Sequence, residues 1–351
     1  MEERGPEVER GPWALALRRF LRNRLAVAFL GLFVLIVVFV LAAPLWAHHV
    51  AHTGPNEEHT VEQITVDGEK KDVVSVEGKP IGPQWFAAGG KFFLGADSRL
   101  GRDEMVRLMY GGRTSLLVGI SAALLATILA IVLGLMAGYF GGWVDSLIAR
   151  SLDVIWSLPV FLIGLAVGIA LAVGGLKIGP LELSSGSLWN PILIISIFTV
   201  PYIARPIRGE VLSLSQKEFV EAAIAQGASP GRVMFTEILP NLASTVIVFF
   251  TLMIANSMLF EAGLSFLGAG VQPPNSSWGT MITVGVDLLR IQPLLAILPG
   301  VMIMLTVLSL NIVGDALRDA LDPRGKGRLD AALQFEAQSA ATRPVREASL
   351  T

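Results

Sequence analysis

The histidines of this chain are gathered in one short stretch, where they could bind a metal ion. All 4 lie between positions 48 and 59, as His48, His49, His52 and His59. His48 and His52 are four apart, so both would face one ion if the preceding helix continued, and imidazole is a common ligand of zinc and nickel. A polar collar at the end of an apolar helix explains the same cluster. We favour the collar and predict no bound metal.

A polar stretch between strongly apolar segments has the features of two short helices. Residues 221–241 read EAAIAQGASPGRVMFTEILPN. Upstream, Ser215 is placed to cap the first helix, with Glu218 three residues on in the capping-box position. Gly227 is placed to end that helix, because a glycine there adopts the left-handed backbone at little cost.

The second short helix begins where the first turn ends. Ser229 and Pro230 fit the N-cap and first position of a helix, and Pro240 would stop it. The pattern predicts a rigid helix–turn–helix elbow that projects from its apolar surroundings. Such an elbow suggests a docking surface.

Motifs for catalysis are missing from the rest of the chain. The sequence has no GxxxxGK[ST] phosphate-binding loop, no HExxH and no GxSxG. All histidines fall in one polar cluster, which argues against a buried Ser-His-Asp triad. We therefore predict no catalytic residues, no cofactor bound by this chain and no ATP hydrolysis by it.

Composition places the chain in a membrane. Of 351 residues, 53% are hydrophobic and only 16% are charged, where soluble domains carry about 25% charged residues. Mean hydropathy is +0.62. The formal net charge of −2 and the lack of a nucleic-acid-binding motif argue against a nucleic-acid partner. There is no cysteine, which excludes disulfides and thiolate chemistry.

Six apolar segments are long enough to span a bilayer, which needs about 20 residues per helix. Pro159 and Pro299 are expected to kink or break their helices. The predicted fold is an all-α membrane protein with six transmembrane helices and a small extracytoplasmic insert. The six segments are 25–47, 114–139, 149–174, 190–206, 242–263 and 292–314.

Lysine and arginine predict the orientation, because they concentrate in cytoplasmic loops. The N-terminal flank, the elbow and the C-terminal tail are all rich in them, whereas the short opposite loops are not. Both termini are therefore expected in the cytoplasm. The first apolar run is too long for a signal peptide, so we expect it to stay as an anchor.

These features divide the chain into five parts. They are a cytoplasmic N-terminal segment 1–24, a first transmembrane helix 25–47, an extracytoplasmic segment 48–112, a transmembrane core 113–317 containing the elbow loop 213–241, and a cytoplasmic tail 318–351. Within the extracytoplasmic segment we expect two short strands around Asp67 and Gly68, either as a solvated hairpin or as a contact for an external binding protein. The tail after 325 is expected to be disordered.

Few charged or strongly polar residues lie near the apolar segments. Asn256, Ser257 and Asn311 lie deep, and either line a polar pathway or bond between helices. Four carboxylates lie near predicted helix ends or in an outer loop, and we expect them to be interfacial rather than part of a transport pathway. They are Asp153, Glu261, Asp287 and Asp315.

Several blocks resemble one family, the C subunits of dipeptide and oligopeptide ABC transporter permeases. The elbow resembles the cytoplasmic coupling loop of the wider ABC importer class through Glu221, Ala222, Ala223, Gly227, Leu239 and Pro240. The more specific blocks are GADSRLGRDEMVRLMYGGRTSLLVG (95–119), AGYFGGWVDSL (137–147), EAGLSFLGAGVQPPNSSWG (261–279) and GDALRDALDPR (314–324). The resemblance covers roughly residues 14 to 324.

The resemblance implies a type I importer permease in the inner membrane. It implies a homologous permease as partner, two ABC ATPase subunits that hold ATP and magnesium, an extracytoplasmic solute-binding protein and surrounding lipid. The implied ATPase-coupling residues are Glu221, Ala222, Ala223, Gly227, Ala228, Ser229, Leu239 and Pro240.

Two questions stay open at this point. The cargo implied by the resemblance is a dipeptide or oligopeptide, but nickel complexes, glutathione or another small solute would use the same machinery. A stand-alone secondary transporter and a scaffold that only recruits ATPases are the other classes. A secondary transporter predicts charges or broken helices at mid-membrane and leaves the elbow without a task.

Overall fold

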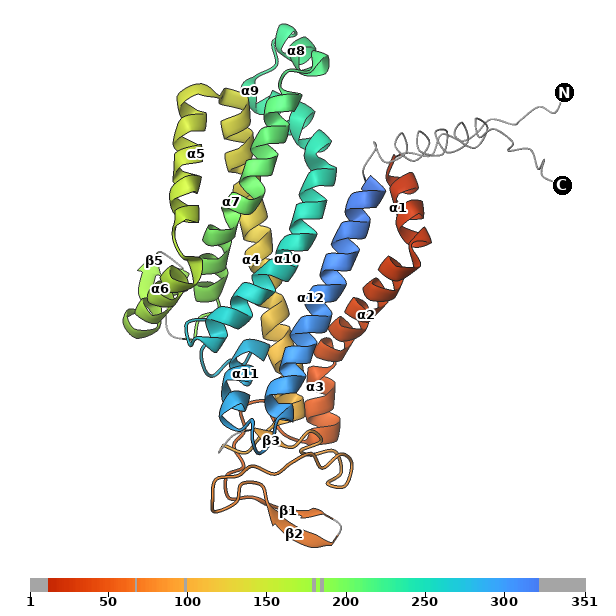
Figure 1. Cartoon of the computed structure of the whole chain (residues 1–351), viewed down its shortest axis with the longest axis vertical. Coiled ribbons are helices and arrows are strands. Elements are labelled where there is room, and N and C mark those ends of the chain that lie inside the picture. The colour runs from red at the N-terminus through yellow and green to blue at the C-terminus, as the bar shows by residue number, and fades with distance from the viewer. Residues whose placement is uncertain (1–11, 67, 98–99, 179–180, 184–185, 322–351) are drawn as a thin grey trace, which may run out of the picture.

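Long helices aligned along one axis make up most of this protein (Figure 1). The computed structural model describes residues 12–66, 68–97, 100–178, 181–183 and 186–321. The predicted disorder of the tail after 325 lies outside these residues.

The first two N-terminal helices pack along the last described helix. The N-terminal helices are α1 (Pro12–Arg22), α2 (Arg24–Leu41) and the short α3 (Ala43–Trp46), followed by a π-helical turn (Ala47–Ala51). Both α1 and α2 contact α12 (Leu294–Leu321). The first predicted span is thus a helix that ends at Leu41 and resumes after a short break.

The central helix of the bundle is α4 (Glu104–Phe140), which packs closely against α7 (Trp189–Leu214). Gly134 and Gly138 lie at this contact, where a Cβ atom would come within 2.6 Å of the side chains of Ile207 and Val211. Small residues four apart allow two helices to approach this closely in a membrane.

The third predicted span is broken, as its proline indicated. It consists of α5 (Gly142–Ser157) and α6 (Val160–Gly174), which are bent by 85° relative to each other. Pro159 lies at the break. The described residues contain 5 helices long and apolar enough to cross a membrane, or up to 6 if this bent pair counts as one span.

Several helices are longer than their apolar segments. The second span begins at Glu104 rather than at 114, because Asp103 caps it by accepting the N–H of Val106 at 3.0 Å. The fourth extends past 206 to Leu214, with Pro201 and Pro206 inside it. Pro299 lies within α12 and does not break it, so of the expected kink or break the structure excludes the break.

The segment 48–112, expected to be extracytoplasmic, contains the expected hairpin. Strands β1 (Gln63–Val66) and β2 (Glu69–Asp72) pair antiparallel, with Gln63 opposite Asp72. Gly68 has a φ of 84°, which suits glycine at a tight turn; Asp67 lies outside the described residues. The side chains of Val66, Val73 and Phe92 give this segment a small core of its own.

A second small sheet anchors this segment to α4. It pairs β3 (Ala96–Asp97) with β4 (Arg102–Asp103). Asp97 forms ion pairs with Arg102 at 2.6 Å and Arg107 at 3.0 Å, so it joins the sheet to the first turns of α4. All three side chains are largely buried, which makes the network sensitive to loss of either partner.

The remaining described elements belong to the same helical bundle or connect its helices. A hairpin of β5 (Leu176–Ile178) and β6 (Leu181–Leu183) precedes α7. Helices α8 (Glu218–Ala225) and α9 (Pro230–Arg232) form the elbow, and α10 (Ala243–Phe266) follows it. Helix α11 (Trp278–Asp287) was not foreseen; it contacts α4, α10 and α12.

The two ends of the molecule differ in character. The elbow helices α8 and α9 lie at one end, together with α1 and the C-terminal end of α12, and the β1–β2 hairpin lies at the other (Figure 1). This arrangement is compatible with the elbow, α1 and the end of α12 on one side of a membrane and the hairpin on the opposite side.

The absence of cysteine makes this orientation testable with single cysteine variants. Lys70 on the exposed strand β2 and the exposed elbow residue Gln226 are suitable positions. In intact cells, a membrane-impermeant thiol reagent is expected to label Lys70→Cys, and to label Gln226→Cys only after permeabilisation. The reverse pattern would contradict the proposed topology.

Candidate functional site: the elbow and the polar interior

The elbow begins later than its sequence suggested. Helix α7 ends at Leu214 and Ser215 is its C-cap, with the Ser215 hydroxyl donating to the carbonyl of Leu212 at 3.0 Å. Lys217 is the N-cap of α8 and provides no side-chain cap. The predicted capping box of Ser215 and Glu218 is therefore wrong, because the longer α7 uses Ser215 in its own last turn.

The end of α8 is where the glycine predicted it. Gly227 has a φ of 82° and lies directly after the C-cap residue. Its N–H donates to the carbonyl of Ile224 at 2.9 Å, and the N–H of Ala228 donates to that of Ala223 at 3.1 Å. These two bonds are the Schellman motif, which turns the chain sharply and satisfies carbonyls at the helix end.

The second half of the elbow begins as predicted but does not stop at Pro240. Ser229 caps it by accepting the N–H of Arg232 at 3.4 Å, and Pro230 occupies the first position. The chain then continues through a π-helical segment (Val233–Ile238) and a 3-10 segment (Leu239–Leu242) into α10. The elbow therefore continues directly into a membrane span.

Local hydrogen bonding explains why Pro240 is tolerated. Pro240 follows the π-helical segment, in which the N–H of Leu239 reaches back to the carbonyl of Met234. The side-chain amide of Asn241 donates to the carbonyl of Glu237 at 2.7 Å, so that carbonyl keeps a partner near the proline. The wider turn accommodates the ring without ending the helix.

The elbow combines internal anchors with exposed apolar side chains. Val220 and Val233 are completely buried and attach its two halves to the protein. Three large apolar side chains remain between 40% and 57% exposed, Phe219, Ile224 and Phe235. The acidic residues Glu218 and Glu221 are exposed beside them on α8. Exposed apolar groups rimmed by charge are typical of protein-binding surfaces.

The predicted coupling residues fall into two groups. Five are exposed, Glu221, Ala222, Gly227, Ser229 and Pro240. The other three, Ala223, Ala228 and Leu239, are half-buried and pack against the hydrophobic core. The elbow thus brings the exposed group to one tip of the molecule and uses the inward-facing group to hold its shape.

The three predicted pathway residues have different surroundings. Asn256 is exposed on α10, and its side-chain amide donates to the carbonyl of Leu252 at 3.2 Å. Ser257 is fully buried, and its hydroxyl has no hydrogen-bond partner among the described residues. Asn311 is half-buried on α12. Their role in a pathway stays a prediction, and Ser257 has no exposed surface in this conformation.

Glu261 is not interfacial, contrary to expectation. Its side chain is 0% exposed, and its carboxylate accepts hydrogen bonds from Ser115 at 2.9 Å and Ser265 at 2.6 Å. The Ser115 hydroxyl also accepts the backbone N–H of Trp278 at 3.1 Å. One buried network therefore joins α4, α10 and α11. Of the other three carboxylates, Asp153, Asp287 and Asp315 are all exposed.

Part of this network had a signal in the sequence. Ser265 lies four residues after Glu261, the spacing at which two helical side chains meet. Ser115 lies 146 residues away in sequence and gave no such signal.

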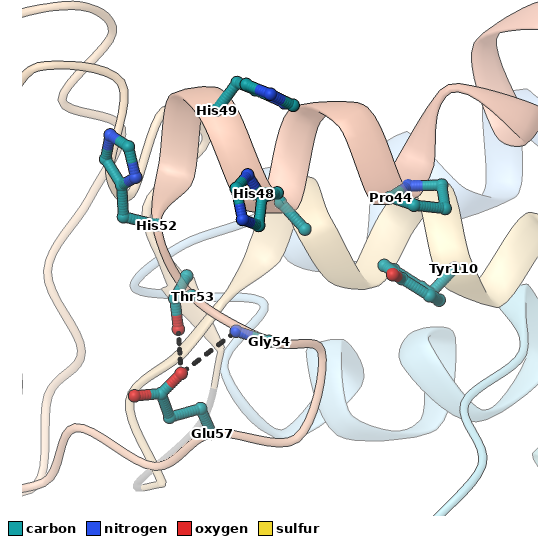
Figure 2. A pocket seen from close by; sticks show the side chains of 9 residues that line it. Pro44, His48, His49, His52, Thr53, Gly54, Glu57 and Tyr110 are labelled. Atoms are coloured by element: carbon teal, nitrogen blue, oxygen red, sulfur yellow. Dashed lines mark hydrogen bonds between the residues drawn. The ribbon is translucent and has the colours of Figure 1, made fainter.

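Three of the four histidines, His48, His49 and His52, line an open groove at the C-terminal end of α3, together with Tyr110 and Glu57 (Figure 2). The N–H of Gly54 and the hydroxyl of Thr53 donate to Glu57 and lower the pKa of that carboxyl. His59 lies apart from the groove lining, with Nε2 2.8 Å from Thr53 Oγ1 and Nδ1 2.5 Å from Glu62.

This arrangement gives the metal hypothesis no support. The described residues contain no group of three or more histidine, aspartate or glutamate side chains placed to share a metal ion. The helix that would have aligned His48 and His52 ends in between, since His52 has a left-handed φ of 50°.

Comparison with known proteins shows the family. The model of the binding-protein-dependent transport system inner membrane component matches residues 130–327, and that of the N-terminal transmembrane domain of oligopeptide transport permease C matches residues 11–59. The chain belongs to this permease family. It is an inner-membrane permease of the ABC importer type.

Two sequence relatives of similar length, from Brucella and Pectobacterium, support the assignment. A peptide permease protein of Brucella ovis is 34% identical over 90% of this chain and 92% of its own length. The glutathione transport system permease protein GsiD of Pectobacterium atrosepticum is 37% identical over 90% of this chain and 93% of its own. An inward-facing structure of the MetNI methionine ABC transporter aligns with 61% of this chain and 96% of its own, at 17% identity and a TM-score of 0.48.

The buried network of this permease predicts a difference between two serines. Ser115→Ala removes a donor from Glu261 and leaves the N–H of Trp278 unpaired, which we expect to cost about 1–3 kcal/mol of unfolding free energy. Ser257→Ala removes a buried hydroxyl without a partner, and should be neutral or slightly stabilising. Unfolding midpoints of the two variants in detergent measure the difference, and equal midpoints would contradict the network.

Proposed function

We propose that this permease forms half of the pathway of an ATP-driven importer for peptides or peptide-like solutes, and that residues 213–241 couple it to ATPase subunits. The elbow carries the proposal, because it presents exposed apolar and acidic side chains on a rigidly closed turn at one tip of the molecule. A groove on an ATPase subunit would cover Phe219, Ile224 and Phe235 and meet the charge of Glu221.

Coupling follows from how the elbow is joined to the membrane helices. The Schellman turn at Gly227 fixes α8 against the second half, and the second half is continuous with α10. On the other side, only a short link separates α8 from the end of α7. A displacement imposed on the elbow would therefore reach α7 and α10 together, which is what alternating access requires.

The proposed importer contains further subunits besides this permease. A homologous permease would contribute the other half of the pathway, and two ATPase subunits would hold ATP and magnesium. An extracytoplasmic solute-binding protein would deliver the cargo. Both termini would lie in the cytoplasm of the inner-membrane protein. A stand-alone secondary transporter would leave the exposed apolar groups of the elbow without a partner, so we do not favour it.

Peptide cargo is proposed from the relatives. One relative is named a peptide permease and another a glutathione permease, and glutathione is itself a small peptide. The same machinery importing nickel complexes or another small solute is the alternative, but no feature of the described residues favours it.

The coupling role predicts the effect of Gly227→Val. A Cβ at Gly227 meets no atom within 4 Å, so the strain comes only from the left-handed backbone, which costs a β-branched residue about 1 kcal/mol or more. We expect normal membrane levels but loss of uptake and of cargo-stimulated ATP hydrolysis in reconstituted vesicles.

A matched control separates backbone strain from added bulk. A Cβ at Gly209 in α7 also meets nothing within 4 Å, and no left-handed φ is found there. Gly209→Val should therefore transport normally. Equal loss in both variants, or wild-type uptake by Gly227→Val, would refute the coupling role of this turn.

Charge at the docking surface gives a separate prediction. Glu221 is exposed, so Glu221→Lys should leave the fold intact while placing the wrong charge against the ATPase. We expect weaker recovery of ATPase subunits when the membrane complex is purified through the permease. Unchanged recovery and unchanged uptake would exclude Glu221 from the interface.

The missing phosphate-binding loop predicts that the purified permease has no ATPase activity by itself. Hydrolysis should appear only when the ATPase subunits are added, measured as phosphate release. ATP hydrolysis by the isolated chain that persists after repeated purification would contradict the proposal that only the ATPase subunits hydrolyse ATP.

A further inference from the structure

Helix α5 presents a polar face that no other described part of this chain covers. Ser146, Arg150, Asp153 and Ser157 are all exposed, and their spacing places them within an arc of roughly 60° on the helix. Their neighbours Leu147 and Val154 are equally exposed but apolar, on an adjacent face. We call the four polar residues the α5 stripe.

An ion pair and an aromatic ring extend the stripe onto α7. The Arg205 guanidinium lies 2.8 Å from the Asp153 carboxylate and 3.7 Å from the ring centroid of Trp156. Asp153 is 57% exposed and Arg205 36%, so both charges remain accessible from outside the chain. The stacked guanidinium uses one N–H on Asp153 and keeps others available.

Asp153 lies in the second half of α5, close to the break between α5 and α6 at Pro159. Asp153 follows the start of α5 at Gly142 by about 16 Å of helix, which is about half of a bilayer core. Beyond it, Leu158 is extended and Pro159 has no N–H, so carbonyls in the last turn of α5 lose their helical donors, and that of Val154 accepts the Ser157 hydroxyl at 2.8 Å instead. Leu158 and Pro159 are both exposed.

These features argue against lipid as the environment of this face. Charged side chains and carbonyls without helical donors at mid-membrane are stable only against protein or in a water-filled cavity. Secondary transporters place broken helices at their binding sites, where freed backbone groups meet the solute.

We propose that the α5 stripe lines a water-filled translocation pathway, and that Asp153 and Arg205 bind the two charged ends of a zwitterionic peptide. This inference rests on the proposed function and names the residues that would contact its cargo. Asp153 attracts the amino group and Arg205 the carboxylate, while Trp156 supports the guanidinium. The ion pair between Asp153 and Arg205 occupies both groups in the absence of cargo.

Cysteine accessibility tests the environment directly. Ser146→Cys and Leu147→Cys form one neighbouring pair, and Asp153→Cys and Val154→Cys form a second, with Leu147 59% and Val154 62% exposed. In the complete complex, with partner subunits freed of cysteine, a small charged thiol reagent should modify the stripe members at least about tenfold faster than their apolar neighbours.

Two other labelling patterns would overturn the proposal. No labelling of the stripe in any nucleotide state would mean that the second permease or lipid covers it. Equal labelling of both members of each pair would mean that the stripe has no special access to water. Protection of Ser146→Cys by dialanine, but not by N-acetylated dialanine amide, is the further expected result.

Uptake kinetics test the charge assignment. Asp153→Asn and Arg205→Gln should raise the KM for radiolabelled dialanine at least about tenfold, with a smaller effect on the maximal rate. The exchange variant Asp153→Arg with Arg205→Asp keeps an ion pair but reverses its direction. It should reach normal membrane levels without restoring the KM, and a restored KM would reduce the pair to a structural role.

The outcomes separate this inference from the proposed function. If the wild-type complex imports neither dialanine nor glutathione, the peptide cargo is wrong. If it imports one of them with an unchanged KM in Asp153→Asn and Arg205→Gln, the cargo stands and the α5 site is wrong.

Discussion

The close contact between α4 and α7 is the constraint on which the other features depend. Gly134 and Gly138 let Ile207 and Val211 approach the α4 backbone, and any side chain at either glycine would separate the helices. Lipid supplies no hydrophobic drive between helices, so packing of this kind supplies much of their association. Because α7 carries both Arg205 and the elbow link, this contact positions the proposed cargo site and the proposed docking surface relative to one scaffold.

The same central helix is attached differently at its outer half. There Ser115 bonds to Glu261 and to the backbone of Trp278, and Asp97 binds Arg107 near the helix start. Apolar contacts tolerate small displacements, but a buried carboxylate with two hydroxyl donors is specific in both distance and direction. Helix α4 thus packs closely on α7 toward the elbow and is joined by directional bonds to α10, α11 and the segment that contains the β1–β2 hairpin.

Local features of the sequence predicted local structure well. Gly227, the Ser229–Pro230 start, the hairpin turn at Gly68 and the break at Pro159 each depend on the backbone preferences of one or two residues. The errors arose where contacts between residues far apart in the sequence determine the local structure. Ser215 looked like a cap because the extension of α7 was not visible, and Glu261 looked interfacial because its partner Ser115 is far away in sequence. Pro240 looked like a stop because a π-helical segment has no sequence signature comparable to a cap.

The uninterrupted helical run from Pro230 to Phe266 has a mechanical consequence. Its 37 residues make a rod of about 55 Å, so pivoting one end by roughly 5° would sweep the other through about 5 Å. Such a rod converts a small angular input into a displacement large enough to open or close a passage. The π and 3-10 turns between Val233 and Leu242 have weaker hydrogen bonding than the α-helix and therefore form its most compliant section. The stiffness of this section, rather than the affinity of the elbow for its partner, would determine how much of an imposed displacement is transmitted to the membrane-spanning part of the helix.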